Sequence, residues 1–230
     1  MAVLNNPPNG NISGSVGDIT YKTIRKKTFI FSKISDPKIP MDEASVSRRE
    51  KFGFCNKLFG AIGKVMWFKS IWKESKIYGA NYINKMFTFG FDMIGGPMDF
   101  DNVPLLPIDS GFEVKQFSVY LNGKFLMLDA EISAAQTGIS ASSNPEISAQ
   151  GIVYFNDPKD KTDKAEQFIS VVSRNIPTET DKVLTFEMQV PATDVFYFES
   201  YNYNRIVLNL MIKNIEGKPT HASVNLCSSL

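Results

Sequence analysis

The stretch FEVKQFSVYLNGKFLMLDAEIS, residues 112–133, decides the fold class of this chain. Apolar and polar residues alternate over residues 112–121, and the alternation resumes over residues 124–133. Asn122-Gly123 separates the two runs, and an Asn-Gly pair in this position is the strongest short-range signal for a two-residue type I′ turn. The stretch therefore predicts an antiparallel β-hairpin near the middle of the chain.

More short strands are expected after this hairpin. A polar loop rich in Ala, Ser and Thr covers residues 134–149, and Glu216-Gly217 marks a late turn. Strand patterns fit residues 150–156, 166–174, 183–190, 194–200, 205–214 and 219–227. Seven or eight short strands separated by turns predict an immunoglobulin-like antiparallel β-sandwich over residues 111–230.

The N-terminal region predicts a turn-rich arm followed by a second hairpin. Residues 5–17 are rich in Asn, Pro, Gly and Ser, which favour turns. Alternation over residues 18–34, interrupted by the basic turn Arg25-Lys26-Lys27, indicates two strands. An isolated hairpin is marginally stable in water. We therefore expect residues 1–34 to pack on another part of the chain or on another copy.

Helices are expected between the two β regions, over residues 35–91. Apolar residues recur with helical spacing over residues 42–73, and Asp42 is suited to cap the first turn. Glycines at positions 53, 60 and 63 lower helix propensity and indicate either a close helix crossing or a break. A shorter helix fits residues 76–90. The Gly- and Pro-rich segment 92–110 is the candidate linker before the sandwich. The predicted fold class is α+β, with an N-terminal hairpin and helices followed by the β-sandwich.

The charge is divided between the two halves of the chain. The whole chain has 25 basic and 24 acidic residues, a net charge of +1. Residues 1–100 carry 15 and 8, hence +7, whereas residues 101–230 carry 10 and 16, hence −6. Charges of opposite sign favour contact between the halves, within one subunit or between neighbours. The basic residues are spread along the helix and the hairpin tip, so nucleic acid is not an expected partner.

Composition also bears on location. A hydrophobic content of 43% excludes a disordered chain. No apolar run reaches the roughly 18 residues of a membrane-spanning helix, so no membrane contact is expected. The N-terminus lacks the basic and apolar regions of a signal peptide. We therefore expect cytoplasmic synthesis without a signal peptide, and then incorporation into an assembled particle or virion.

The residues needed for common catalytic chemistry are scarce. His221 is the only histidine, and neither a G-x-S-x-G elbow nor a phosphate-binding loop occurs. The glycines at positions 10, 14 and 17 precede a predicted strand, whereas a dinucleotide site needs glycines after a strand. Two acidic clusters, 99–102 and 156–163, lack the spacing of a calcium loop. The sequence thus predicts a protein that is not an enzyme and has no cofactor, no catalytic residue and no metal site.

Candidate contact residues are aromatic. Tyr201, Asn202 and Tyr203 lie in the densest aromatic stretch, where rings could stack on sugars and the amide could bond hydroxyl groups. The alternative is a core strand followed by a tyrosine-rich loop. For protein contacts, the hairpin and the long helix offer Tyr21, Phe29, Phe31, Phe59, Trp67 and Trp72. Cys55 and Cys227 are expected to be reduced, small hydrophobic side chains, with a disulfide as the alternative.

Several motifs also resemble a known group of proteins. These are SGSVGDITY at residues 13–21, the basic hairpin after it, Ser47-Arg48-Arg49 with Phe52 opening a helix, and the Ser-rich end of the chain. Together they resemble a family of uncharacterised bacterial proteins, mostly from Bacteroidota and their mobile elements. The resemblance implies an SGxxG-x3-Y hairpin, a basic helix and a β-sandwich, and it transfers no catalytic residue.

The function expected from these observations is structural. The sequence predicts a self-associating component of a phage or phage-like particle or filament. Its expected partners are other copies of the chain or other structural proteins. The alternative is a β-sandwich module that binds carbohydrate or protein.

Overall fold

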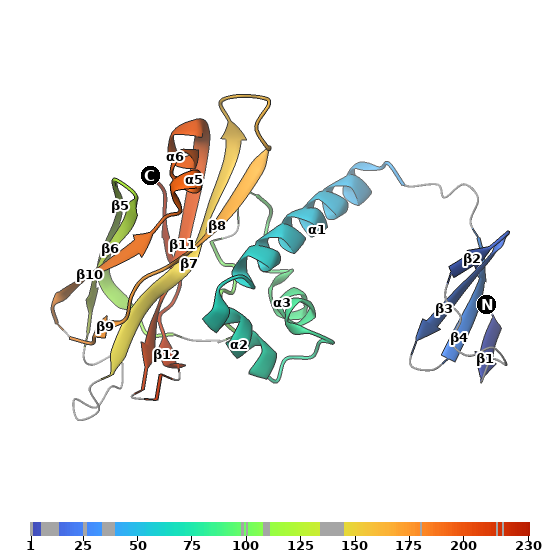
Figure 1. The fold of residues 1–230 in the computed structure, drawn as a ribbon, viewed down its shortest axis with the longest axis horizontal. Helices are drawn as coiled ribbons and strands as arrows, with labels where there is room; N and C mark the ends of the chain where they lie inside the picture. Colours follow the sequence, from blue (N-terminus) through green and yellow to red (C-terminus); the bar gives the residue numbers. More distant parts are fainter. Residues whose placement is uncertain are drawn as a thin grey trace. The chain divides into compact units, whose positions relative to one another are not determined.

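The computed structural model describes residues 2–5, 14–24, 27–33, 40–97, 99, 101–107, 111–133, 145–179, 181–214, 216–217 and 219–230. The chain forms two compact units, Met1–Ser47 and Arg48–Leu230 (Figure 1). This division lies near the start of the first helix and not in the candidate linker 92–110. Each unit is described by itself below.

The N-terminal unit is a four-stranded antiparallel sheet with the order β1-β4-β3-β2. Its strands are β1 (Ala2–Asn5), β2 (Gly14–Val16), β3 (Ile19–Ile24) and β4 (Lys27–Ser32). The predicted hairpin is present as β3 and β4, which pair from Ile19↔Ser32 to Ile24↔Lys27. Arg25 and Lys26 of the predicted turn lie outside the described residues. Two further strands flank the hairpin, because parts of the predicted arm pair with its two edges.

The second unit contains two antiparallel sheets. The small sheet has the order β10-β6-β5, with β5 (Val114–Asn122), β6 (Phe125–Ile132) and β10 (Val183–Gln189). The large sheet has the order β12-β11-β7-β8, with β13 paired to β11 and β9 paired to β7. Its strands are β7 (Glu146–Pro158), β8 (Glu166–Val172), β9 (Ile176–Pro177), β11 (Tyr201–Lys213), β12 (Pro219–Ala222) and β13 (Leu226–Ser228).

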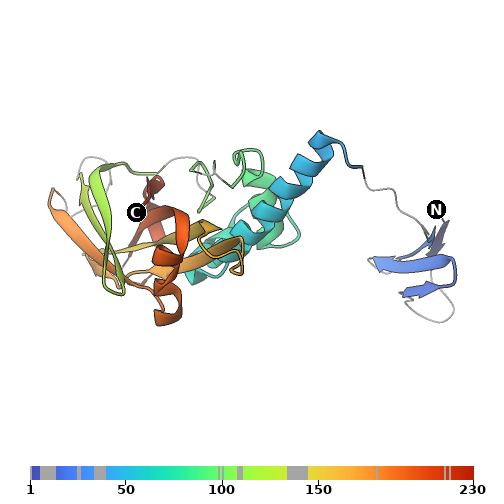
Figure 2. The same ribbon diagram turned by 90° about the horizontal axis from the view of Figure 1, so that it is seen from above.

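The large sheet is the middle of three layers. One core lies between the two sheets, and a second core lies between the large sheet and the helices (Figures 1 and 2). Side chains of β7 alternate between these cores, with Val153 in the first and Ile152 and Tyr154 in the second. Strand β11 does the same, so residues 206–213 are all buried. The α+β fold with sandwich-like sheets is confirmed.

Three helices cover the outer face of the large sheet, namely α1 (Glu43–Ile62), α2 (Met66–Glu74) and α3 (Tyr82–Gly90). The prediction of a single helix over residues 42–73 is therefore wrong, because α1 ends at Ile62 and a separate helix, α2, begins at Met66. A Cβ on Gly63 would lie 2.6 Å from Cε2 of Tyr82. This close approach of α3 explains why a glycine stands at the break. The helix predicted over residues 76–90 begins later, where the Asn81 side chain accepts a hydrogen bond from the Asn84 N–H.

The segment predicted as a linker belongs to the helical core. Ile94, Val103, Leu105 and Leu106 are buried in it. The Asn225 amide donates to the carbonyl oxygens of Asp101 and Val103, which fixes the segment beside β13. The described residues between 92 and 107 are therefore part of the packing of the second unit.

The central hairpin is present, but its turn differs from the prediction. Asn122 pairs with Phe125, so Gly123 and Lys124 form the turn. Of these two, only Gly123 has a positive φ, +57°. A positive φ at the first turn residue alone is typical of type II′, whereas type I′ needs it at both. The predicted turn is thus displaced by one residue.

The strand predicted over residues 194–200 is instead a pair of short helices, α5 (Ala192–Val195) and α6 (Tyr197–Ser200). In a strand, neighbouring side chains point to opposite faces. In this helical turn, the adjacent rings of Tyr197 and Phe198 both contact Phe155, with centroid distances of 5.6 and 4.9 Å. Burial of both rings against the same core residue explains the helical conformation.

Candidate functional site

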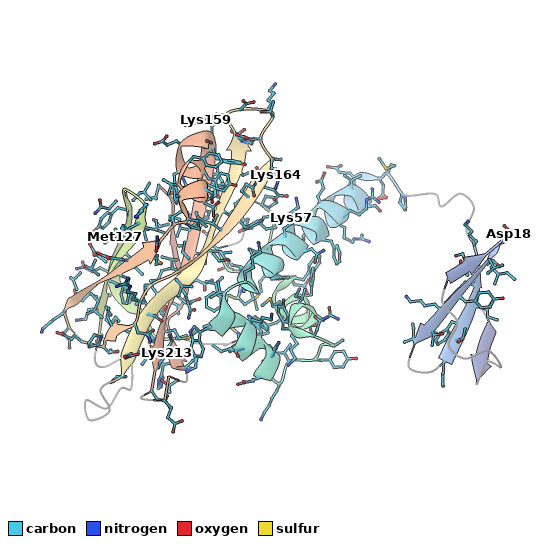
Figure 3. All side chains as sticks on the ribbon, viewed as in Figure 1. Asp18, Lys57, Met127, Lys159, Lys164 and Lys213 are labelled. Atoms are coloured by element: carbon cyan, nitrogen blue, oxygen red, sulfur yellow. The ribbon has the colours of Figure 1, made fainter. Side chains whose placement is uncertain are left out.

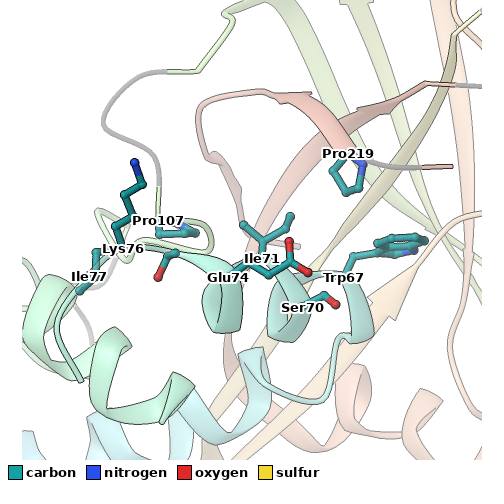
Figure 4. Close-up of a pocket in the computed structure, with 9 residues that line it drawn as sticks. Trp67, Ser70, Ile71, Glu74, Lys76, Ile77, Pro107 and Pro219 are labelled. Atoms are coloured by element: carbon teal, nitrogen blue, oxygen red, sulfur yellow. The ribbon is translucent and has the colours of Figure 1, made fainter. Parts of the chain in front are cut away.

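A cleft with a volume of about 770 Å³ lies along α2 (Figure 4). Trp67, Ile71 and Glu74 line it from successive turns of the helix. The other walls come from distant parts of the chain, with Pro107 after the buried segment and Pro219 at the start of β12. Its lining combines an aromatic ring and aliphatic groups with the carboxylate of Glu74 and serine hydroxyls.

The Trp67 ring is held from the sheet side by Lys213. The Lys213 Nζ lies 4.7 Å from the centre of the ring, although the Lys213 side chain is only 3% exposed (Figure 3). The ammonium donates to Asn175 Oδ1 at 2.7 Å, and the Asn175 amide donates to Glu146 Oε2 at 2.8 Å. Burial lowers the pKa of Lys213, and the charge of Glu146 opposes that shift. A cation on the ring and this hydrogen-bond chain fix the orientation of Trp67.

The rim of the cleft is fixed at the C-terminus of α2. Lys85, on α3, donates to the carbonyl oxygens of Lys73 and Ser75 at 2.7 and 2.5 Å. A cation near a helix C-terminus satisfies carbonyl groups that have no partner within the helix. These bonds join α2 and α3 at the rim, and the mixed lining of the cleft suits an amphipathic ligand.

A second cavity, of about 560 Å³, lies beneath residues 101–106 beside β11. Asn209 lines it, is 2% exposed, and donates through its amide to the Ser223 carbonyl at 2.8 Å. Within the described residues the Asn209 Oδ1 has no hydrogen-bond partner. Gln150, directly opposite Asn209 on β7, also has a buried unpaired oxygen. Of these two side chains only Asn209 lines the cavity, so its Oδ1 is an acceptor there for a hydrogen-bond donor such as water.

The predicted contact residues of the helical region differ in their exposure to solvent. Phe59 and Trp72 have no exposed surface. Trp72 donates to the Leu105 carbonyl at 2.9 Å, so both residues are core side chains and not surface contacts. Trp67 is half-buried and lines the α2 cleft.

The contact residues predicted in the N-terminal unit are accessible. Tyr21 and Phe29 are half-buried, and Phe31 is exposed. Directly paired residues share a face of a sheet, and Tyr21 pairs with Ile30 while Phe31 pairs with Thr20. Tyr21 therefore lies on one face, whereas Phe29 and Phe31 lie on the other.

The predicted glycan residues do not form a joint surface. Tyr201 is 4% exposed, and its hydroxyl donates to the Lys164 carbonyl at 2.8 Å. Its ring belongs to the core between the sheets and is not free to stack on a sugar. Tyr203 points to the opposite core, and only Asn202 is exposed, donating to Asp157 Oδ2. The three residues are therefore separated, with the two tyrosine rings in different cores and the asparagine amide at the surface.

The two cysteines and Asp101 lie in surroundings that indicate a role in packing. Both cysteines are free, and burial raises the pKa of the Cys227 thiol to about 11. Asp101, from the first acidic cluster, forms a forked ion pair with Arg205. Among the described residues, no three His, Cys, Asp or Glu side chains gather as a metal site. Nor does any described helix have the length and hydropathy needed to span a membrane.

Comparisons with known proteins identify no family for this chain. No protein-family model matches it, and no curated protein does. Among solved structures, a DUF3823 family protein from Bacteroides ovatus matches with 16% identity and a TM-score of 0.27. The match covers 52% of this chain and 55% of that protein, so the chain spans about half of its length. The family of that protein is named only as a domain of unknown function. A similarity this weak carries no argument about fold or activity.

Proposed function

We propose that this chain is a non-enzymatic assembly protein whose subunits associate through the N-terminal sheet. Stable small sheets need an apolar face packed against a second layer. The described part of residues 1–47 contains one sheet and the first turn of α1, with no second layer of its own. A neighbouring subunit would supply that layer.

The side chains of this sheet support the proposal. Val16 and Ile19, which pair across β2 and β3, are 72% and 43% exposed. On the opposite face, Ile24 and Phe31 are 45% and 37% exposed. Apolar side chains on both faces are unusual for a sheet that ends in water, since one face is normally polar. A particle or filament, as the sequence predicts, would cover both.

Ile24→Lys is expected to lower the mass of the assembled protein in light scattering. The new ammonium would have to be buried without a partner in the contact, which is costly. Val183→Lys is the matched control, because Val183 is also a β-branched strand residue and is 56% exposed, but lies on β10. Circular dichroism would check that both variants fold. Equal masses for Ile24→Lys and the unmodified chain would contradict the proposal.

A second candidate function, ligand binding, is favoured by the α2 cleft. An indole held in place beside Ser70 and Glu74 provides an apolar ring and hydrogen-bonding groups, a combination that suits a sugar. The candidate site thereby moves from Tyr201, Asn202 and Tyr203 to Trp67.

Trp67→Leu is expected to abolish binding to any glycan that the unmodified chain binds on a glycan array. Leucine preserves apolar contact but removes the flat face on which a sugar ring stacks. Tyr78→Leu is the control, because Tyr78 is 88% exposed and is not among the residues lining the cleft. An array on which the unmodified chain binds nothing would exclude the carbohydrate ligand.

A further inference from the structure

The outer edge of the small sheet is incompletely covered. Phe117, Val119 and Leu121 of β5 pair with Ala130, Leu128 and Leu126, so they face the core between the sheets. Nevertheless Phe117 is 38% exposed and Leu121 is 36% exposed. On β10, at the other edge of the same sheet, the inward-facing residues Leu184, Phe186 and Met188 are 8% exposed or less. Only the β5 edge therefore leaves its core-facing side chains in contact with solvent.

The backbone of β5 is open along this edge. Among the described residues, β5 pairs only with β6. In a two-residue hairpin the pair flanking the turn, here Asn122 and Phe125, exchanges both hydrogen bonds, and such pairs alternate along the strands. The N–H and C=O groups of Phe117, Val119 and Leu121 consequently point away from β6. The residues with uncovered side chains are thus also the residues with unpaired backbone groups.

The order of residues along β5 is self-complementary. The sequence QFSVYLN (residues 116–122) is symmetric in polarity about Val119. Moving outward from Val119 in either direction, the positions are polar, apolar and polar. An antiparallel partner with the same sequence can therefore place Val119 opposite Val119, and Phe117 opposite Leu121. Those pairs are also the ones whose backbone groups point outward, so each would exchange two hydrogen bonds. We infer that β5 pairs with β5 of a second copy around a two-fold axis at Val119.

The charges on β5 allow this pairing. Natural edge strands commonly avoid association through charged residues, prolines or bulges. Lys115, the only charged residue of β5, is engaged with Glu131 and Asp181 at 2.9 and 2.8 Å. The irregularity of β5 also lies at this end, between Val114 and Gln116. The segment from Phe117 to Asn122 has none of these protective features, and the paired register places no like charges opposite each other.

This inference rests on the proposed function, since it assumes that the chain self-associates, but it uses a different surface. A two-fold contact at β5 joins subunits in pairs. The N-terminal sheet would then connect those pairs into larger assemblies. The two contacts can be disrupted separately, because their residues lie in different units.

Val119→Cys tests the register. At a hydrogen-bonded antiparallel pair the Cα atoms are about 5.5 Å apart, which a disulfide can bridge. Oxidation of the full-length variant is expected to give a covalent dimer on a non-reducing gel. Ser118→Cys is the matched control, because Ser118 would face Tyr120 of the partner subunit, and its own copy would lie about 7–8 Å away on the diagonal. No covalent dimer from Val119→Cys, or equal dimer from both variants, would overturn the inference.

Val119→Pro tests the edge contact through its hydrogen bonds. Proline removes the Val119 N–H, which points to solvent in an isolated subunit and takes no part in the pairing of β5 with β6. The β5–β6 pairing is therefore retained. In the Ile24→Lys background, we expect light scattering to show half the mass seen without the proline. Tyr120→Pro should instead lower the melting temperature, since the Tyr120 N–H points toward β6.

The outcomes separate the two proposals. If Val119→Pro leaves the mass measured by light scattering unchanged, the β5 contact is overturned, whether or not Ile24→Lys lowers the mass. Covalent dimers from Val119→Cys together with no effect of Ile24→Lys would overturn the N-terminal contact alone.

Discussion

Gly151→Val is expected to destabilise the protein by at least about 3 kcal/mol, the upper part of the range for overpacked cores. Gly151 lies in the middle of β7, between Leu208 of β11 and Val171 of β8. A Cβ at this position would clash with the Val207 carbonyl oxygen and lie 2.8 Å from the Leu208 Cα. Because backbone atoms cannot move aside as a flexible side chain can, the central pair of strands would have to separate.

Thermal unfolding followed by circular dichroism would measure this effect. For a unit of this size, 3 kcal/mol lowers the melting temperature by roughly 6–12 °C. Gly53→Ala is the control, because Gly53 is exposed on α1 and a Cβ there would meet nothing within 4 Å. Alanine should stabilise that helix by up to about 1 kcal/mol. A melting temperature unchanged by Gly151→Val would show that β7 and β11 are less closely paired than described.

Trp72→Ala is expected to cost about 3–5 kcal/mol of stability, as for other fully buried large aromatic residues. The Trp72 ring is completely buried and packs edge-on against Phe89, with a centroid distance of 5.9 Å. Its indole N–H also satisfies the Leu105 carbonyl, which would be left buried without a donor. The variant should therefore loosen both α2 and the segment that follows α3.

This variant also distinguishes a core role from a contact role. A contact residue would change the mass of the assembly and leave the melting temperature in place, whereas a core residue lowers the melting temperature. Trp72→Phe should recover part of the loss, since it restores most of the ring volume but not the hydrogen bond. Trp67→Ala serves as the comparison, because Trp67 is half-buried and should cost less. Equal melting temperatures for Trp72→Ala and the unmodified chain would return Trp72 to the contact residues.

Local patterns in the sequence predicted most of the strands. A period of two along β5 and β6, with turn residues between them, is a property of neighbouring residues and does not depend on what packs against them. The same holds for β8 and β10. The turn of the central hairpin differed by one residue, because Gly123 accepts a positive φ at the first position of a type II′ turn as readily as at the second position of a type I′ turn.

Helical periodicity was less decisive. The apolar spacing continues through Gly63, so periodicity predicts one helix, and three glycines left open either a break or a close helix crossing without deciding between them. The helix ends beside Gly63, where a Cβ would meet the Tyr82 ring of another helix. The α5–α6 segment is a similar case, since its aromatic residues fit a strand pattern but turn helically to bury two adjacent rings on Phe155.

The candidate sites depended most on tertiary structure. Trp67 and Trp72 lie five positions apart on one short helix, yet one lines a cleft and the other is a core residue. Their difference comes from Pro107, Pro219 and Lys213, which are distant in sequence. Likewise, Tyr201 is buried in the core between the sheets, whereas the next residue of β11, Asn202, is exposed.

The sequence alone determined that this chain is an α+β protein with an N-terminal hairpin, helices and a β-rich C-terminal region, because alternation and turn residues act locally. Only the tertiary structure decided that the large sheet is covered on both faces, that Ile94, Val103, Leu105 and Leu106 belong to the helical core, and that β5 ends the small sheet with its core-facing side chains exposed. These features depend on which surfaces meet. Residues far apart in the chain determine which surfaces meet, and no local sequence pattern predicts it.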